Sequence, residues 1–594
     1  MEIDDRPNLV ALFFSQAERL GDRPFLWERR DGTYRPTTWR EAAHDVAALA
    51  AALRALGLAR GDRVALLAPN SPRWAVADFA IMAAGGVTVP VYTTNTPANH
   101  EHILNDSGAT IAIVANAPLA RPFVDAAQKS RHLRHIVAMD DLGPLDAARI
   151  AVTPWAIAIA DGQKGADAVV ADAIGIDRSA LACLIYTSGT GGDPKGVMLS
   201  HRAIMTNCAG AIHLLDELGL GDETFLSFLP LSHAYEHTAG LMFPVSIGAQ
   251  VYFAERADTL ATNLLEARPT IMTAVPRLYE ILRERIIKDI GRQNQLRRRL
   301  FWAAVEIGRK AYEHPELLSA WERIADRILD RLVRDKFRAR FGGRLKALVS
   351  GGAPLNYEIG VFFTALGLRL LQGYGQTEAA PVITCNRPSR VKLRTVGPPL
   401  KDVQLHIADD GEILVRGPLL MDGYWKIPKL SAEVLRDGWL HTGDVGVIDQ
   451  DGYLQITDRK KDIIVNSAGD TLSPQRIEGI LALEPEIEFA AVFGDSRPHI
   501  VAVVVPPADF VASWARARKV GADLASLSRD KDFRDAIGRA VERANRSLGA
   551  PEKVKRFVVA EQPFSIETGT MTPTMKPRRR EIMRRWGAAI EQLY

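Results

Sequence analysis

The amino-acid sequence predicts an α/β protein with a large multi-layer N-terminal domain of sheets and helices and a small, mobile α+β C-terminal domain. Its 594 residues exceed the size at which a single hydrophobic core stops growing. Segments with helical periodicity alternate with apolar, β-branched runs, as in proteins whose helices cover sheets. Near Asp458 to Asp462 the pattern changes to short strands, turns and a charged helical tail. We therefore expect domains at 1–458 and 459–594, with the hinge near 458–462.

The alternation begins with a helix predicted over 38–58. Apolar residues recur there at helical spacing, and Thr38 is placed to cap the first turn. The next segment, 61–69, predicts a turn followed by a buried strand. Three later segments, 86–92, 109–116 and 134–140, are β-branched and mostly apolar. This composition is typical of strands that are covered on both faces, so we expect layered sheets with helices outside.

Composition and charge exclude several classes of function. The apolar fraction of 47% and the charged fraction of 24% are those of a globular protein. A formal charge of +3 is too small for a nucleic-acid-binding chain of this length. The three cysteines are widely spaced, without the pairing of a zinc knuckle or a disulfide framework. The acidic N-terminus is unlike a signal peptide, and the longest uncharged stretches are broken by glycine, proline and polar residues, so we expect a cytoplasmic protein.

A long helical segment between Leu282 and Lys346 has roughly twice as many basic as acidic residues and contains three consecutive arginines at 297–299. Four aromatic residues are interleaved with these charges: Phe301, Trp302, Trp321 and Phe337. A solvated helical face is the plain interpretation. The alternative is a surface for anionic lipid or an acyl donor, because interfacial helices mix aromatic and basic residues in this way. Contact with the membrane would then be peripheral, at its inner face.

The segment YTSGTGGDPKG, from Tyr186 to Gly196, combines hydroxyls, glycines and one lysine after an apolar strand. A Walker A loop is excluded because Pro194 precedes the lysine and Gly196 follows it. The glycine spacing of a Rossmann fingerprint is also missing. What remains is a loop whose backbone N–H groups and hydroxyls can surround the outer phosphates of a nucleotide.

This loop resembles the phosphate loop of the acyl-adenylate-forming superfamily, which includes acyl-CoA synthetases, adenylation domains and luciferases. Four later segments resemble the remaining signatures of that superfamily in the right order: GYGQTEAAP (373–381), HTGD (441–444), DRKKD (458–462) and TPTMK (572–576). The resemblance covers nearly the whole chain. The loop departs from the family at Gly191, where a second threonine is usual.

The resemblance implies a set of ligand contacts and catalytic residues. The nucleotide contacts are Thr187, Ser188, Gly189, Thr190, Gly192, Lys195, Gly351, Gly352, Ala353, Tyr374, Gly375, Asp444 and Arg459. Tyr374 would stack on adenine, Asp444 would accept the ribose hydroxyls, and Glu378 would bind Mg²⁺. Thr377 and Glu378 indicate a Mg²⁺ site independently of the resemblance, because a carboxylate beside a hydroxyl is an oxygen site suited to Mg²⁺ on a triphosphate.

Two lysines carry the expected chemistry of the C-terminal domain. Lys461 corresponds to the hinge of the family, in a polar segment that tolerates backbone change. Lys576 corresponds to the adenylation lysine, whose ammonium group stabilises negative charge on the attacking carboxylate and the α-phosphate. Thr377 and Glu378 complete the catalytic set.

A competing motif, H-x-x-E-H, lies at His233 to His237 and is the pattern of an inverted zinc-peptidase site. The same segment, LPLSHAYEH, resembles the family segment near the acyl pocket, which places His233 at that pocket without metal. Because this segment, the basic insertion and the spacing after the hinge resemble the long-chain branch, the resemblance implies a long-chain fatty acid–CoA ligase.

The implied reaction uses ATP, Mg²⁺ and CoA to convert a long-chain fatty acid through acyl-AMP to the acyl-CoA thioester. Three alternatives stay open: an adenylating ligase for another carboxylic acid, transfer to a carrier protein or an amino acid instead of free CoA, and a metallopeptidase or a binding module. The expected partners are fatty acid and CoA, and no nucleic acid. A homodimer is compatible with the sequence.

Overall fold

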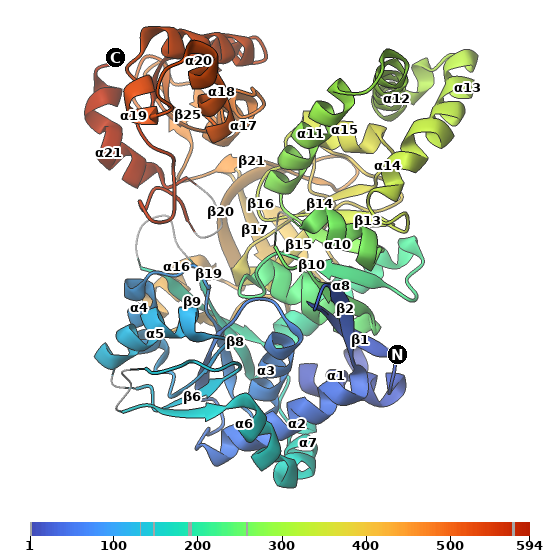
Figure 1. Cartoon of the computed structure of the whole chain (residues 1–594), viewed down its shortest axis with the longest axis vertical. Helices are drawn as coiled ribbons and strands as arrows, with labels where there is room; N and C mark the ends of the chain where they lie inside the picture. Colours follow the sequence, from blue (N-terminus) through green and yellow to red (C-terminus); the bar gives the residue numbers. More distant parts are fainter. Residues whose placement is uncertain (1–2, 131, 146–148, 188–192, 257–258, 573–576) are drawn as a thin grey trace.

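The chain forms a large body and a smaller C-terminal body at one end of it (Figure 1). The computed structural model describes residues 3–130, 132–145, 149–187, 193–256, 259–572 and 577–594. Within these residues, two eight-stranded sheets form the framework of the large body. A third, five-stranded sheet leads toward the C-terminal body. The predicted fold class is confirmed.

The first sheet is mainly parallel and provides part of the candidate site. In spatial order its strands are β15 (Val382–Cys385), β14 (Leu370–Gly375), β13 (Ala347–Ser350), β12 (Ile271–Ala274), β10 (Thr224–Ser227), β11 (Gln250–Phe253), β1 (Pro24–Arg30) and β2 (Thr33–Thr38). Only the outer pairs β14–β15 and β1–β2 are antiparallel among these. The carboxyl ends of β12, β13 and β14 therefore lie at one edge, where α/β proteins bind ligands.

The second sheet carries the strand that leads into the phosphate-loop segment. In spatial order its strands are β18 (Gly423–Tyr424), β9 (Lys195–Ser200), β8 (Leu181–Thr187), β4 (Val87–Pro90), β3 (Arg63–Leu67), β5 (Ile111–Val114), β6 (His135–Ala138) and β7 (Ala151–Pro154). The predicted strand segments 61–69, 86–92, 109–116 and 134–140 contain β3, β4, β5 and β6. The pairs β3–β4, β3–β5 and β5–β6 are parallel, whereas β8–β9 and β9–β18 are antiparallel.

Helices cover both faces of the two eight-stranded sheets. The helices of the large body are α1 (Leu9–Leu20), α2 (Trp39–Ala55), α3 (Pro72–Ala83), α4 (Pro97–Ser107), α5 (Ala117–Lys129), α6 (Trp155–Gly162), α7 (Ala166–Ile174), α8 (His201–Leu215), α9 (Phe243–Ile247), α10 (Leu260–Ala267), α11 (Pro276–Gly291), α12 (Gln295–Glu313), α13 (Ala320–Leu329), α14 (Asp335–Ala339), α15 (Tyr357–Ala365) and α16 (Pro428–Val434). The predicted helix over 38–58 is α2, and Thr38 and Glu41 form its capping box.

Alternate residues of the strands enter different hydrophobic cores. Phe225 of β10 packs in the core between the two sheets, whereas Leu226 packs in a second core with α10, α11, α12 and α15. Leu66 of β3 joins the core between the sheets, whereas Leu67 joins a third core with α4 and α5. Because side chains alternate along a strand, both sheets are covered on both faces, as the apolar strand sequences predicted.

The third sheet and the C-terminal body complete the fold. The third sheet contains β16 (Gln404–Ile407), β17 (Glu412–Arg416), β20 (Trp439–Ile448), β19 (Leu435–Arg436) and β21 (Leu454–Arg459). The C-terminal body contains β22 (Ile464–Val465), β23 (Thr471–Leu472), β24 (Phe489–Phe493), β25 (Ile500–Val505) and β26 (Val554–Val559). Its helices are α17 (Pro474–Leu481), α18 (Ala508–Arg518), α19 (Leu524–Leu527), α20 (Lys531–Asn545) and α21 (Arg579–Glu591). The exact domain boundary at 458–462 stays a prediction.

The predicted basic helical segment corresponds to α11 through α14, with a short π-helical turn η6 (Asp330–Arg334) between α13 and α14. One part of the prediction was wrong. Phe301 and Phe337 do not lie among the surface charges, because both are buried in the core beneath α12 and α14. Trp302 and Trp321 are exposed, as predicted.

Candidate functional site

The described ends of the phosphate-loop segment lie at the turn of a β-hairpin. Thr187 ends β8 and Lys195 begins β9, and the two residues are cross-strand partners. The predicted contacts Ser188, Gly189, Thr190 and Gly192 lie outside the described residues, as does Gly191. The strand before the loop is held by the Tyr186 hydroxyl, which donates to Asp106 Oδ2 at 2.6 Å.

Lys195 and Glu378 both lie against a residue that the sequence analysis missed, Tyr424. The Lys195 ammonium lies 5.6 Å from the centroid of the Tyr424 ring, and the Tyr424 hydroxyl donates to Glu378 Oε1 at 2.7 Å. Tyr424 reaches this position because β18 pairs with β9, with Tyr424 opposite Val197. Burial, followed by the charge of Glu378, raises the pKa of Tyr424, so it stays a hydrogen-bond donor at neutral pH.

Tyr374, Asp444 and Arg459 form a second cluster next to the end of β14. The Tyr374 hydroxyl donates to Asp444 Oδ2 at 2.6 Å, and Arg459 Nε donates to Asp444 Oδ1 at 3.1 Å. Asp444 is 5% exposed and Tyr374 is 8% exposed. Asp444 lies within strand β20 directly opposite Arg459 of β21. The buried carboxylate thus has a hydrogen-bond donor on each oxygen and a positive charge beside it.

Two of the predicted nucleotide-contact glycines, Gly351 and Gly375, lie where there is no room for a side chain. Gly351 follows β13, and a Cβ atom there would lie 2.9 Å from Cζ of Tyr235. A Cβ atom at Gly375 would lie 1.8 Å from the carbonyl oxygen of Pro381. Gly352, the next residue after Gly351, has a positive φ of 79°. Ala353 follows it and is half-buried.

The parallel pairing of β13 with β14 places this turn and the 373–378 segment at neighbouring strand ends. A side chain at Gly375 would displace the backbone at Pro381, and one at Gly351 would displace the Tyr235 ring.

The two residues of the predicted Thr377–Glu378 pair differ in exposure. Thr377 is buried, whereas Glu378 is half-buried. No group of three or more potential metal ligands from His, Cys, Asp and Glu occurs among the residues that the structure describes. Glu378 fits Mg²⁺ nonetheless, because this ion is commonly held by one or two carboxylates together with substrate phosphates.

The H-x-x-E-H segment does not form a zinc site in the described part of the chain. His237 Nε2 lies 2.9 Å from Asp78 Oδ2, and both side chains are fully buried. Glu236 Oε2 instead accepts a hydrogen bond from the Thr273 hydroxyl at 2.6 Å. The His233 ring is half-buried and its Nδ1 accepts from the Tyr235 N–H at 3.1 Å. The three side chains therefore have different partners, and the segment continues into the π-helical η4 (Glu236–Met242).

An apolar cavity of about 50 Å³ lies between α8, the η4 segment and the first sheet. Its lining residues are Asn207, Cys208, Ala211, Leu214, Leu215, Phe225, Tyr235, Thr238, Ala239, Phe243, Ile271, Thr273, Val349, Val382, Cys385 and Leu400. His233 is not among them, although its neighbour Tyr235 is. The sequence indicated only the segment around His233, because the other walls come from the four strands β10, β12, β13 and β15, the helices α8 and α9, and Leu400, which are far apart along the chain.

The predicted hinge lies directly after β21. Lys461 is exposed in a turn in which the Asp462 N–H donates to the Arg459 carbonyl at 2.9 Å. The neighbouring Lys460 ammonium donates to Asp410 Oδ2 at 2.6 Å and to Glu412 Oε2 at 3.1 Å, both in the large body. Lys576 lies outside the described residues, so its predicted role stays a prediction.

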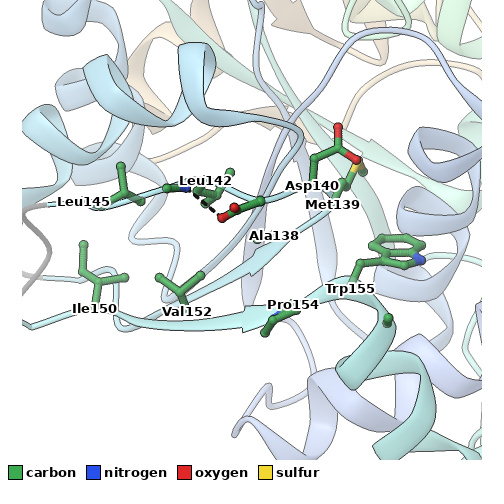
Figure 2. A pocket seen from close by; sticks show the side chains of 12 residues that line it. Ala138, Met139, Asp140, Leu142, Leu145, Ile150, Val152, Pro154 and Trp155 are labelled. Carbon is green, nitrogen blue, oxygen red and sulfur yellow. Dashed lines mark hydrogen bonds between the residues drawn. The ribbon is translucent and has the colours of Figure 1, made fainter.

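A larger hollow of about 580 Å³ lies elsewhere, between the ends of β6 and β7 (Figure 2). It is lined by Asp140, Asp141 and several apolar side chains including Trp155. Asp140 is engaged by Arg73 Nη1 at 2.9 Å, and Asp141 accepts from the Gly143 N–H. Because β7 is one edge strand of the second sheet and β9 lies next to the other edge strand, β18, this hollow is separate from the candidate site.

Comparisons with known proteins identify the family. A family model described as AMP-binding enzyme matches residues 13–425, and one described as AMP-binding enzyme C-terminal domain matches residues 461–594. The chain is 32% identical to the long-chain-fatty-acid–CoA ligase FadD15 of Mycobacterium bovis, over 100% of this chain and 98% of the relative. It is 31% identical to long chain acyl-CoA synthetase 1 of Arabidopsis thaliana, over 98% of this chain and 92% of the relative.

The fold also matches a solved structure. The adenylation domain of a carboxylate reductase from Mycobacterium chelonae superposes with a TM-score of 0.75 at 23% identity, and the match covers 100% of this chain and 92% of that one. Together with the family matches over both bodies, these similarities show that the chain belongs to the AMP-binding enzyme family.

Proposed function

We propose that this protein is a long-chain fatty acid–CoA ligase that forms acyl-AMP from ATP and a fatty acid and then transfers the acyl group to CoA. The observation that carries the proposal is the meeting of Lys195, Tyr424 and Glu378 beside Tyr374, Asp444 and Arg459. These residues come from four segments far apart in the sequence. They supply an ammonium group and a carboxylate for a triphosphate and its Mg²⁺, and a buried carboxylate for a ribose. The names of the full-length relatives support the long-chain acid and CoA as substrates.

In the first half-reaction, an oxygen of the fatty acid carboxylate attacks the α-phosphorus of ATP, and the bond to the bridging oxygen breaks to release pyrophosphate. Asp444 holds the ribose by accepting its hydroxyls, in a position set by Tyr374 and Arg459. Lys195 and the phosphate loop hold the outer phosphates, where positive charge and N–H groups stabilise the leaving pyrophosphate.

The Glu378 carboxylate is the described residue that would hold Mg²⁺. Tyr424 donates a hydrogen bond to Oε1 of this carboxylate and thereby restrains its orientation. When bound, the ion supplies positive charge against the triphosphate. Tyr424 is therefore a positioning residue for Glu378.

In the second half-reaction, the CoA thiolate attacks the acyl carbon of acyl-AMP, and AMP leaves. We propose that the C-terminal body turns about Lys461 between the two halves, so that Lys576 serves adenylation and then makes way for the thiol. The exposed turn at 460–462 supports this role, because a hinge must change its backbone angles without losing core contacts.

We propose that the apolar cavity beside Tyr235 receives the part of the acyl chain next to the carboxylate. Each buried methylene contributes roughly 0.8 kcal/mol to binding, so an apolar wall selects for long chains. The cavity is far smaller than the roughly 300 Å³ at which ligand pockets begin. Side chains around it must therefore move when a long chain enters.

ATP–pyrophosphate exchange with a panel of fatty acids tests the proposal. We expect exchange that depends on a long-chain acid without CoA, and acyl-CoA formation when CoA is added. Exchange without CoA consumption would instead indicate transfer to a carrier protein or an amino acid. Exchange only with aromatic or amino acids would contradict the acyl substrate.

The variant Lys576→Ala tests the division of the reaction. It is expected to lower acyl-AMP formation by at least about a hundredfold, because it removes charge stabilisation from the transition state. Thioester formation from supplied acyl-AMP is expected to stay near the wild-type rate. Equal loss of both halves would contradict a lysine that serves adenylation alone.

Three further expectations stay predictions: a homodimer, a cytoplasmic location and contact with the inner face of a membrane. In the described part of the chain, no helix combines the length and the apolar character needed to cross a bilayer.

A further inference from the structure

An apolar stripe lies exposed on the outer face of α13 and the η6 turn. It consists of Trp321, Ile324, Ile328 and Leu332, which recur at helical spacing along one face. Trp321 is 80% exposed and Ile328 is 52% exposed, and the other two are exposed to a similar degree as Ile328. Leu317, immediately before this helix, is also exposed. Soluble proteins seldom expose so many large apolar side chains together, and such patches mark interaction sites.

A row of arginines runs beside this stripe. Arg327 lies three positions after Ile324 and Arg331 three positions after Ile328, so each pair is adjacent on the helix surface, and Arg323 continues the basic row four positions before Arg327. All three side chains are exposed, and none forms an ion pair with a carboxylate among the described residues. The arginines at 297–299 of α12 are likewise exposed, without such a partner in the part of the chain that the structure describes.

The acidic residues of this region are engaged elsewhere. Glu322 binds Lys310 of α12 at 2.7 Å, and Asp326 binds the buried Arg334 at 2.7 Å. Asp330 binds Arg338 at 2.9 Å. The surface that remains is therefore apolar and positively charged.

The opposite face of the helix is firmly packed. Leu329 is buried, and the Arg334 guanidinium donates to the carbonyls of Ala304 and Ala365 at 3.1 and 2.7 Å. Ser319 caps the helix in a capping box with Glu322. The stripe is thus presented outward by an anchored helix at the edge of the large body (Figure 1).

We propose that this surface, defined by the stripe Trp321, Ile324, Ile328 and Leu332 and the row Arg323, Arg327 and Arg331, docks the enzyme on a bilayer rich in anionic lipid. A helix with apolar residues including tryptophan on one side and arginines beside them lies in the plane of a membrane interface. The arginines meet lipid phosphates while the apolar side chains enter the acyl region. The charge of the row selects an anionic bilayer over a second copy of this positively charged surface, which would repel it.

Vesicle sedimentation tests the proposal directly. The wild-type chain is expected to bind vesicles of phosphatidylglycerol and phosphatidylcholine at low salt, and to bind pure phosphatidylcholine much more weakly. Each arginine near an anionic surface contributes about fivefold in affinity, so Arg323→Gln, Arg327→Gln and Arg331→Gln together should weaken binding by about a hundredfold. Trp321→Ser combined with Ile328→Ser should weaken it by at least about tenfold, because the apolar contact is lost.

Matched variants elsewhere in the chain test whether the loss of vesicle binding is specific to this surface, or follows from removing any exposed charge or apolar side chain. Ile157→Ser on α6 replaces a side chain that is 51% exposed, and a triple change of exposed arginines to glutamine uses Arg516, Arg534 and Arg539 of the C-terminal body. Both controls should bind vesicles like the wild type. Equal weakening by the controls, or wild-type binding that ignores lipid charge, would overturn the proposal.

Light scattering after size-exclusion chromatography tests the other possible occupant of this surface, which is a second copy of the chain. A dimer that Trp321→Ser abolishes would show that a second copy covers the stripe, and would overturn docking on lipid. The inference is independent of the proposed ligase chemistry. If the chain binds vesicles but forms no acyl-CoA, the docking proposal holds and the ligase proposal is contradicted. If it forms acyl-CoA but does not bind vesicles, only the docking proposal is contradicted.

Discussion

At the scale of single residues, the Asp444 carboxylate shows how a buried charge can be kept ready for a ligand. Tyr374 and Arg459 donate to its two oxygens, which offsets the cost of taking a charged group out of water. Each oxygen retains lone pairs beyond the one already used. The carboxylate is therefore both held in place and able to accept ribose hydroxyls.

The variant Asp444→Asn tests this role. It keeps the shape of the side chain but removes the charge, and hydrogen bonds to charged groups contribute about 1.5–3 kcal/mol. We expect the KM for ATP to rise by about ten- to a hundredfold in pyrophosphate exchange. The exposed Asp437→Asn, on the same sheet beside β19, is the matched control and should leave this KM unchanged. An unchanged KM for Asp444→Asn would contradict the assignment.

Glu236 provides a pH-dependent test at the same scale. Burial raises the pKa of Glu236 from 4.5 to about 7. The folded chain therefore binds a proton between about pH 4.5 and pH 7 that the unfolded chain releases. Its stability must fall as pH rises through this range, by roughly 3 kcal/mol in all.

Glu236→Gln removes this dependence, because the amide cannot ionise and can still accept from Thr273. The midpoint of thermal unfolding should match that of the wild type near pH 4.5 and exceed it by several degrees at pH 8. A difference that is the same at both pH values would show that Glu236 does not change its protonation. The exposed Glu433→Gln is the control.

At the scale of elements, α8 and the η4 segment form one wall of the acyl cavity against the first sheet. Ala211 of α8 lies in this wall, so Ala211→Leu should fill part of the cavity. Each methylene that is excluded costs about fourfold in kcat/KM, and the preference should shift to shorter acids. A chain-length panel measures the shift, and Ala209→Leu on the same helix, outside the wall, should not change it. A uniform loss over all acids would instead indicate misfolding of α8.

Element-level patterns were predicted well where local sequence decides them. The helix from Trp39 and the strands at 63–67, 87–90, 111–114 and 135–138 follow from capping and from runs of apolar residues. The burial of Phe301 and Phe337 could not be predicted from the local sequence. Which face of a helix is buried depends on the elements that pack against it, and the basic residues of this segment are too numerous to mark its outer face.

At the scale of the whole molecule, the motifs identified the chemistry but not all of the residues that assemble it. The predicted Tyr374, Asp444 and Arg459 are in contact, as are Lys195 and Glu378 with Tyr424. Tyr424 was missed because its role depends on the pairing of β18 with β9, which joins residues more than 200 positions apart. The cavity walls were missed for the same reason, since packing between distant segments is not encoded in any local motif.

The two bodies are joined by contacts that can be altered without touching the chemistry. Arg277 of α11 binds Glu488, next to β24, at 2.9 Å and lies over the Phe489 ring. Asn356 also donates to the Gly479 carbonyl at 3.3 Å. These contacts stabilise the present arrangement of the bodies over any other that the hinge permits. Their loss should change the balance between arrangements and therefore between the two half-reactions.

A charge exchange across this contact tests whether the bodies change their arrangement during the reaction. Arg277→Glu places like charges together, and Glu488→Arg does the same in reverse. Both residues are partly exposed, so each change should shift the equilibrium between arrangements by about 1 kcal/mol, or about fivefold. The ratio of pyrophosphate exchange to thioester formation from supplied acyl-AMP should change in the same direction in both single variants. The double variant restores an ion pair and should return the ratio toward that of the wild type. If the two half-reactions slow equally in each single variant, the contact affects stability rather than the arrangement of the bodies, and a two-arrangement mechanism loses its support.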